Sequence, residues 1–245
     1  MTFVLNILSK DYSLIAADRK GTSQGPIEMK VGSLSISIPG GGVIDGVNKM
    51  RLNEARTCAV GIAGTVEAHG YIDEFLKCSE GRQAVRTITA WLERQLAVEK
   101  LEDYLSGAPT MEHQLIATFF DEKSEAFYSC LHLFTRYRTY TNVDARFQNP
   151  QPILLHVGSG SGNFEKAVGL DAINAFLDRL REGLSLEERL EWIANAFRAV
   201  SEIDDGVGID FEAVMATRET RKFETVKAPK GGIQVSPLVL PNAPA

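Results

Sequence analysis

The first two residues of the chain, Met1 and Thr2, could together give rise to a nucleophile that carries its own base. Cells commonly remove an initiator methionine that precedes a small residue, which would leave Thr2 with a free α-amine beside its β-hydroxyl. An α-amine has a pKa of about 7.7–8.0, so part of it is neutral at pH 7 and can accept the hydroxyl proton. A nearby lysine would lower the pKa of the amine further, and a buried aspartate would hold that lysine in place. The simpler alternative is that Thr2 only begins a β-strand.

A second candidate is the glycine-rich segment GSGSG at 158–162, which follows an apolar run and precedes a helical pattern. That context is typical of phosphate-binding turns. The segment is not GxGxxG, because Asn163 stands at the sixth position, and no Gly-Lys-Ser/Thr follows it. Backbone N–H groups and small hydroxyls in such a turn can also hold a group other than phosphate. We therefore expect no nucleotide and no other cofactor.

The remaining polar residues favour structural roles. No two histidines are spaced as zinc ligands on a helix, no G-x-S-x-G elbow supports a serine triad, and the three cysteines form no metal or disulfide pattern. We expect no metal site. The acids Asp204 and Asp205 precede Gly206 and, taken alone, indicate a solvated turn. The residues concerned are His69, His113, His132 and His156, with Cys58, Cys78 and Cys130.

Composition narrows the class of protein. The chain has 245 residues, a net charge of −6 and a pI near 5.4, which argues against general nucleic-acid binding because no basic face would neutralise phosphates. No apolar run approaches the roughly 18 residues of a membrane helix, and no secretory signal is evident. We expect a cytoplasmic protein.

The elements that must position these groups follow from hydrophobic periodicity. Runs of strands alternate with pairs of helices, which predicts an α+β fold in which two antiparallel sheets pack face to face with helices outside. Residues 1–222 are expected to form one domain, and the proline-rich segment 223–245 a tail or arm. Strands are predicted at 3–8, 12–17, 27–38, 50–63, 113–121, 125–134, 137–143, 153–157 and 208–217, and helices at 65–78, 82–105, 164–181 and 186–200, the last with a capping box at Ser185 and Glu188.

Four separated blocks resemble proteasome β subunits and their bacterial relative HslV. The run LIAADRKGTS places Asp18 16 residues after Thr2, as that family does. Lys49 precedes a strand that ends in GIAGT, with 15 residues from Lys49 to Gly64 as in the HslV branch. HVGSGSGNF and GVGIDFEAV are similar to the Gly-Ser-Gly turn and the closing strand of the family. The predicted element order also agrees with the αββα sandwich of these proteins.

The resemblance implies a threonine peptidase of the N-terminal nucleophile type. Thr2 would be the nucleophile and its amine the base, Asp18 and Lys49 a charge pair that tunes it, Gly64 the oxyanion donor through its N–H, and Ser159 a hydrogen-bond partner of the amine. It also implies peptide or protein substrates, a homo-oligomer of stacked rings, and an ATP-dependent unfoldase as a partner, with neither nucleic acid nor membrane involved.

The chain departs from the family pattern at Phe3, where the family usually has a small residue, in the proline-rich tail, and at two further places that bear on the site. About 15 extra residues separate Asp18 from Lys49, including the 31–46 insert, which leaves Lys30 as the rival lysine. The family's Asp-x-x-Ser-Gly motif, aligned on GID at 208–210, puts Glu202 at the aspartate and Asp205 at the serine, and Asp204 fits only with a local shift. These departures motivate a catalytically silent ring-forming scaffold as an alternative, and a small-molecule amidase is a second.

Overall fold

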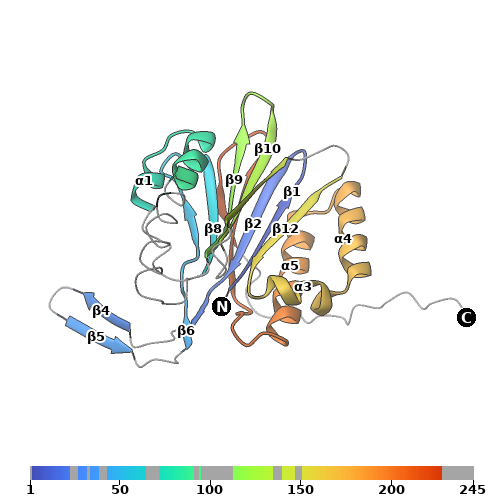
Figure 1. Cartoon of the computed structure of the whole chain (residues 1–245). Helices are drawn as coiled ribbons and strands as arrows, with labels where there is room; N and C mark the ends of the chain where they lie inside the picture. The colour runs from blue at the N-terminus through green and yellow to red at the C-terminus, as the bar shows by residue number, and fades with distance from the viewer. Residues whose placement is uncertain are drawn as a thin grey trace, which may run out of the picture.

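The amino-terminal strand is an interior strand of the first of two five-stranded sheets in the computed structural model (Figure 1). The structure describes residues 2–22, 27–31, 34–38, 43–64, 72–90, 94, 113–134, 140–146 and 151–227. The first sheet has the order β12-β1-β2-β13-β14 and all its neighbours are antiparallel. Its strands are β1 (Phe3–Leu8), β2 (Tyr12–Asp18), β12 (Ile153–Gly158), β13 (Phe211–Thr217) and β14 (Glu224–Val226).

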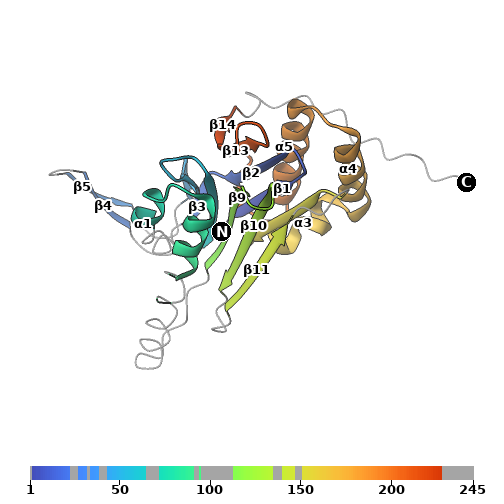
Figure 2. The same ribbon diagram turned by 90° about the horizontal axis from the view of Figure 1, so that it is seen from above.

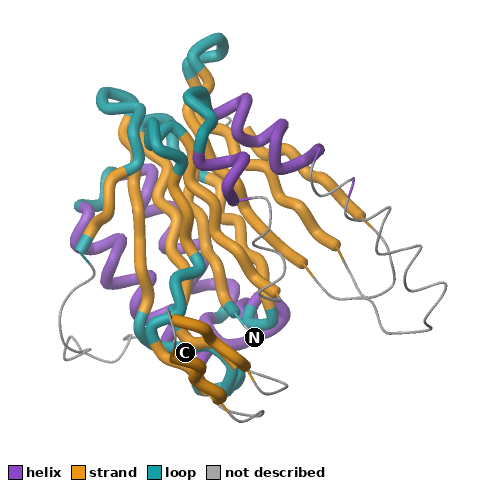
Figure 3. The backbone as a smooth tube through the Cα atoms, turned by 90° about the vertical axis from the view of Figure 1, so that its left-hand side faces the viewer, coloured by secondary structure: helices purple, strands orange, loops and turns teal. Residues whose placement is uncertain are grey.

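The second sheet has the order β11-β10-β9-β8-β7 and packs face to face on the first. Figure 3 shows the strands of the two sheets running side by side along the body, with the amino terminus at one end of them. Between the sheets lie side chains of both, among them Val4, Ile15, Ala59 and Ile116. The strands of this sheet are β7 (Met50–Leu52), β8 (Cys58–Gly64), β9 (His113–Asp121), β10 (Ala126–Phe134) and β11 (Tyr140–Arg146).

Strand β1 explains why the apolar pattern begins at the first residues. Its side chains alternate between two cores, as the period of two along a strand requires. Phe3, Leu5 and Ile7 pack in the cluster beneath the carboxy-terminal helices, whereas Val4 and Leu8 pack between the sheets. All six of its residues are buried, so the strand is anchored on both faces.

Helices cover the outer face of each sheet (Figures 1 and 2). Over the first sheet lie α3 (Ser161–Val168), α4 (Leu170–Glu182) and α5 (Leu186–Ser201), and over the second lie α1 (Ile72–Leu76) and a helical segment at 81–90. The predicted sandwich of two antiparallel sheets with helices outside is therefore confirmed. The capping box of α5 is also present, with Ser185 Oγ accepting from Glu188 N and the Glu188 carboxylate accepting from Ser185 N.

Two element predictions need correction. The helix predicted at 164–181 is divided into α3 and α4 by Gly169, whose φ of +86° interrupts the helical backbone. The strand predicted at 27–38 is a hairpin of β4 (Ile27–Val31) and β5 (Leu34–Ile38), carried on the pair β3 (Lys20–Thr22) and β6 (Val43–Asp45). Beyond residue 222, β14 pairs with β13 next to the fully buried Phe223.

Some predictions fall on residues outside the described ones. These are the first turns of the helix predicted at 65–78, most of the helix beyond residue 90, and the tail from residue 228. Across the described part of the chain, no helix combines the length and hydrophobicity needed to span a bilayer.

Candidate active site

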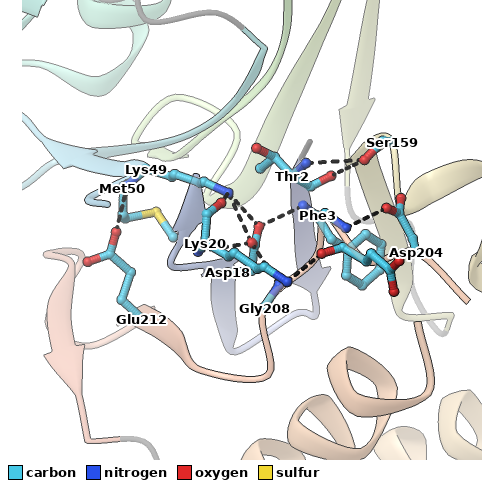
Figure 4. A network of polar contacts seen from close by, with 12 residues as sticks. Thr2, Phe3, Asp18, Lys20, Lys49, Met50, Ser159, Asp204, Gly208 and Glu212 are labelled. Carbon is cyan, nitrogen blue, oxygen red and sulfur yellow. Dashed lines mark hydrogen bonds and ion pairs between the residues drawn. The ribbon is translucent and has the colours of Figure 1, made fainter. Parts of the chain in front are cut away.

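Thr2 lies at the entrance to β1 and is held by the turn that follows β12. Its side chain and backbone are almost fully buried, with 3% of the residue exposed. Thr2 N lies 3.2 Å from Ser159 Oγ, and Gly160 N donates to the Thr2 carbonyl oxygen at 3.3 Å. The structure thus brings Ser159 to the backbone nitrogen that would become the α-amine once Met1 is removed (Figure 4).

Asp18 ends β2 and collects hydrogen bonds from three separate parts of the backbone. The N–H groups of Phe3, Lys20 and Gly208 donate to its carboxylate at 2.8, 3.2 and 3.1 Å. Asp18 is completely buried, so these donors replace the water that the carboxylate loses on folding. One of them belongs to the residue that follows Thr2, which ties the position of the chain start to Asp18.

Lys49 completes the buried charge pair. Its Nζ lies 2.9 Å from each carboxylate oxygen of Asp18 and also donates to the carbonyl oxygen of Lys20. Burial lowers the pKa of Lys49, and the charge of Asp18 opposes that effect. Figure 4 shows this pair on one side of Thr2 and Ser159 on the other. The rival Lys30 belongs to β4, opposite Ser35 in the hairpin.

Glu212 supports Lys49 from β13, and the sequence reasoning missed it. Its Oε1 accepts from Lys49 N at 3.0 Å and from Met50 N at 2.9 Å. Burial raises the pKa of Glu212. The sequence feature that could have indicated Glu212 is its place as an acid at the second position of an otherwise apolar strand, because charged side chains are rarely buried in a sheet core without a partner.

Gly64 ends β8 opposite His113. The neighbouring Ala63 brings this end of β8 to the turn at Gly158, because a Cβ placed on Gly158 would lie 3.3 Å from Ala63 Cβ. The same Cβ would lie 2.8 Å from the Thr2 carbonyl carbon. Gly158 therefore lies next to both Thr2 and Ala63, and Gly64 is the residue that follows Ala63 on β8.

Of the three acids considered after α5, the structure brings only Asp204 into the interior. Glu202 is the exposed C-cap of α5, since that helix continues through residue 201. Asp205 is exposed, and its carbonyl oxygen accepts from Lys20 Nζ. Asp204 is 8% exposed, and its Oδ1 accepts from Gly206 N at 2.9 Å, which shapes the turn leading to Gly208.

This placement changes the alignment to the Asp-x-x-Ser-Gly motif. With Asp204 at the aspartate, the serine position is taken by Val207 and the glycine by Gly208. Val207 is 1% exposed and packs in the apolar cluster beneath the helices. The site therefore has an apolar side chain where the motif has a hydroxyl.

The described residues contain no group of three or more His, Cys, Asp or Glu side chains placed to hold a metal ion. The polar groups around Thr2 are instead a hydroxyl, an ammonium, a carboxylate and backbone N–H groups. This set can hold an amine, tune its basicity and donate to an oxyanion.

Comparison with known proteins supports the fold. No family model and no curated protein matches the chain. Among solved structures, that of the Anbu (Gly-1) mutant from Hyphomicrobium sp. strain MC1 is similar, with a TM-score of 0.56 and 14% sequence identity. The similarity covers 95% of this chain and 89% of that chain. At this identity the likeness shows a shared fold.

Proposed function

We propose that the chain is a threonine-type peptidase whose nucleophile is the Thr2 hydroxyl and whose base is the Thr2 α-amine. The observation that carries this proposal is the convergence of the buried Asp18–Lys49 pair and the hydroxyl of Ser159 on the start of the chain. Ser159 Oγ lies at Thr2 N, Asp18 binds the N–H of Phe3, and Lys49 pairs with Asp18. A residue that only began a strand would need neither a buried cation nor a serine at its nitrogen.

In the proposed reaction, Thr2 Oγ attacks the carbonyl carbon of a peptide bond while the α-amine takes the hydroxyl proton. The carbonyl oxygen gains the negative charge, and the N–H of Gly64 is the proposed donor to it. The C–N bond then breaks, and the leaving amine receives the proton from the Thr2 ammonium. Water hydrolyses the resulting ester and releases Thr2 with its hydroxyl restored.

The charged pair has a defined part in this scheme. The ammonium of Lys49 lowers the pKa of the neighbouring α-amine, so a larger fraction of the amine is neutral and able to act as a base. Asp18 holds that ammonium at 2.9 Å, and its charge opposes the lowering of the Lys49 pKa by burial. Ser159 orients the lone pair of the amine.

The proposal extends to assembly and location through the resemblance to proteasome β subunits and HslV. We propose a cytoplasmic homo-oligomer of stacked rings that takes peptide or protein substrates, with an ATP-dependent unfoldase as its partner. Size-exclusion chromatography with multi-angle light scattering on the purified protein tests the assembly, because a ring has many times the 26.9 kDa mass of one chain. A monomeric particle at micromolar concentration would contradict it.

A catalytically silent ring-forming scaffold is the second candidate. The observation that favours it is Val207, which provides no hydroxyl at the serine position of the Asp-x-x-Ser-Gly motif. The silent protein would keep the buried Asp18–Lys49 pair for stability and leave Thr2 unreactive.

Intact-mass spectrometry before and after exposure to a β-lactone probe decides between the two. We expect loss of one methionine and a single covalent adduct in the wild type, retention of the adduct in Thr2→Ser, and no adduct in Thr2→Ala. An adduct in Thr2→Ala would overturn the assigned nucleophile. A trimmed wild-type chain that forms no adduct would support the scaffold, and so would a chain whose Met1 is retained.

A further inference from the structure

The turn that holds Thr2 depends on a backbone position that only glycine can occupy. Gly158 has a φ of +104°, in the region that L side chains rarely adopt. A Cβ there would also overlap the Thr2 carbonyl group, with its carbon 2.8 Å away. Ser159 follows directly, so the orientation of the Gly158 peptide fixes where the serine hydroxyl meets Thr2 N.

Gly158 ends β12, which is the edge strand of its sheet among the strands that the structure describes. In the order β12-β1-β2-β13-β14, β12 pairs with β1 alone of these strands. The restraint on its free side comes from a side chain of the other sheet. Gly158 N donates to Gln114 Oε1 at 2.8 Å, and Gln114 is half-buried on β9.

The backbone of Gln114 lies beside the second half of the site. In the β8–β9 ladder Gln114 is opposite Ala63, and the next pair joins Gly64 to His113. Gln114 therefore has two contacts with the site. Its backbone belongs to the β8–β9 ladder that places Gly64, and its side chain binds the turn that presents Ser159.

We propose that Gln114 is a positioning residue that sets the distance between the Ser159 turn and the end of β8. The inference rests on the proposed function, because these two parts are the amine partner and the oxyanion donor in that scheme. Misplacement of reacting groups by about 1 Å can cost on the order of 10²-fold in rate. Loss of the amide acceptor leaves the Gly158 peptide free to rotate.

The test compares Gln114→Leu, which removes the acceptor at similar volume, with Gln114→Glu, which keeps an acceptor oxygen. We expect the first-order rate of β-lactone adduct formation to fall about 10- to 100-fold in Gln114→Leu and to return to within a few-fold of wild type in Gln114→Glu. Gln83→Leu, the same substitution at an exposed position of the 81–90 helix, is the matched control and should react as wild type.

Hydrogen exchange of the Gly158 amide, followed by NMR, reports on the hydrogen bond between Gly158 N and Gln114 Oε1 and does not depend on adduct formation. Exchange should be faster in Gln114→Leu and unchanged in Gln114→Glu. Wild-type exchange or a wild-type adduct rate in Gln114→Leu would overturn the inference, as would an equal rate loss in Gln114→Glu. If the wild type itself forms no adduct, the proposed function fails, and faster exchange in Gln114→Leu alone would still establish the tether.

Discussion

The buried pair of Asp18 and Lys49 allows a sharp prediction about stability. The two side chains are 0% and 6% exposed, so Lys49→Met would leave a carboxylate in the interior without its cation. Breaking a buried pair in this way costs about 3–5 kcal/mol. Three backbone N–H groups still donate to Asp18, which places the expected cost at the low end, about 3 kcal/mol.

That cost can be converted to a change in melting temperature. For a domain of 150–250 residues, 1 kcal/mol shifts Tm by about 2–4 °C, so we expect Lys49→Met to melt roughly 6–12 °C below wild type. Thermal unfolding followed by circular dichroism at pH 7 measures it. Lys10→Met is the matched control, because Lys10 pairs with Asp11 at the surface with side-chain exposures of 64% and 62%. Such pairs contribute about 0–1 kcal/mol.

A double-variant cycle separates the charge effect from the loss of packing. Once Asp18→Asn has removed the negative charge, Lys49→Met no longer leaves a buried ion unpaired. The double variant should therefore be less destabilised than the sum of the single variants. A Lys49→Met protein that melts within about 2 °C of wild type, or strictly additive single effects, would refute the reasoning.

Three further predictions concern the surroundings of Thr2. Gly158→Ala should abolish adduct formation, whereas Gly183→Ala, which has a similar φ of +101° but open space around it, should lose only about 1–2 kcal/mol in chemical denaturation and react normally. Glu212→Ala should cost about 1–3 kcal/mol because it leaves two backbone N–H groups without their acceptor. Burial raises the pKa of Glu212, so the stability gained from its protonation is present below pH 4.5 and is lost as pH rises through the raised pKa. Glu212→Gln should remove this pH dependence, measured by urea titrations at several pH values. Burial lowers the pKa of His156, so the folded state holds it neutral and stability falls as pH drops below 6.5; the decline should be shallower in His156→Gln, measured as Tm against pH.

Much of the fold follows from local patterns. The apolar runs around Thr2 and Asp18 predict β1 and β2, because strands buried on both faces read as continuous hydrophobic segments. Ser185 and Glu188 predict the start of α5 through a capping box that needs only four residues of sequence. The division of the predicted helix at Gly169 was missed because a single glycine inside a helical pattern can be tolerated and does not by itself mark a break.

The candidate site residues were nominated in two different ways. The chemistry of an amino-terminal threonine drew attention to Thr2, whereas Asp18 and Ser159 were nominated by the resemblance to proteasome β subunits and HslV. Glu212 and Gln114 act across 163 and 44 positions of sequence, respectively, and a local pattern gives no sign of such contacts. The choice of Asp204 over Glu202 depends on where α5 ends, which is the least certain feature of a helix read from sequence.

The hydrogen bond between Gly208 and Asp18 spans 190 positions, and Ser159 lies 157 positions from Thr2. During synthesis, Thr2 and Asp18 therefore leave the ribosome long before Ser159 and Gly208 have been added to the chain. A growing chain carries Thr2 without its serine, and Asp18 without one of its three backbone donors, until most of the protein has been synthesised. A peptidase built this way would complete the surroundings of its reactive group only once the carboxy-terminal half of the chain has folded onto the amino terminus.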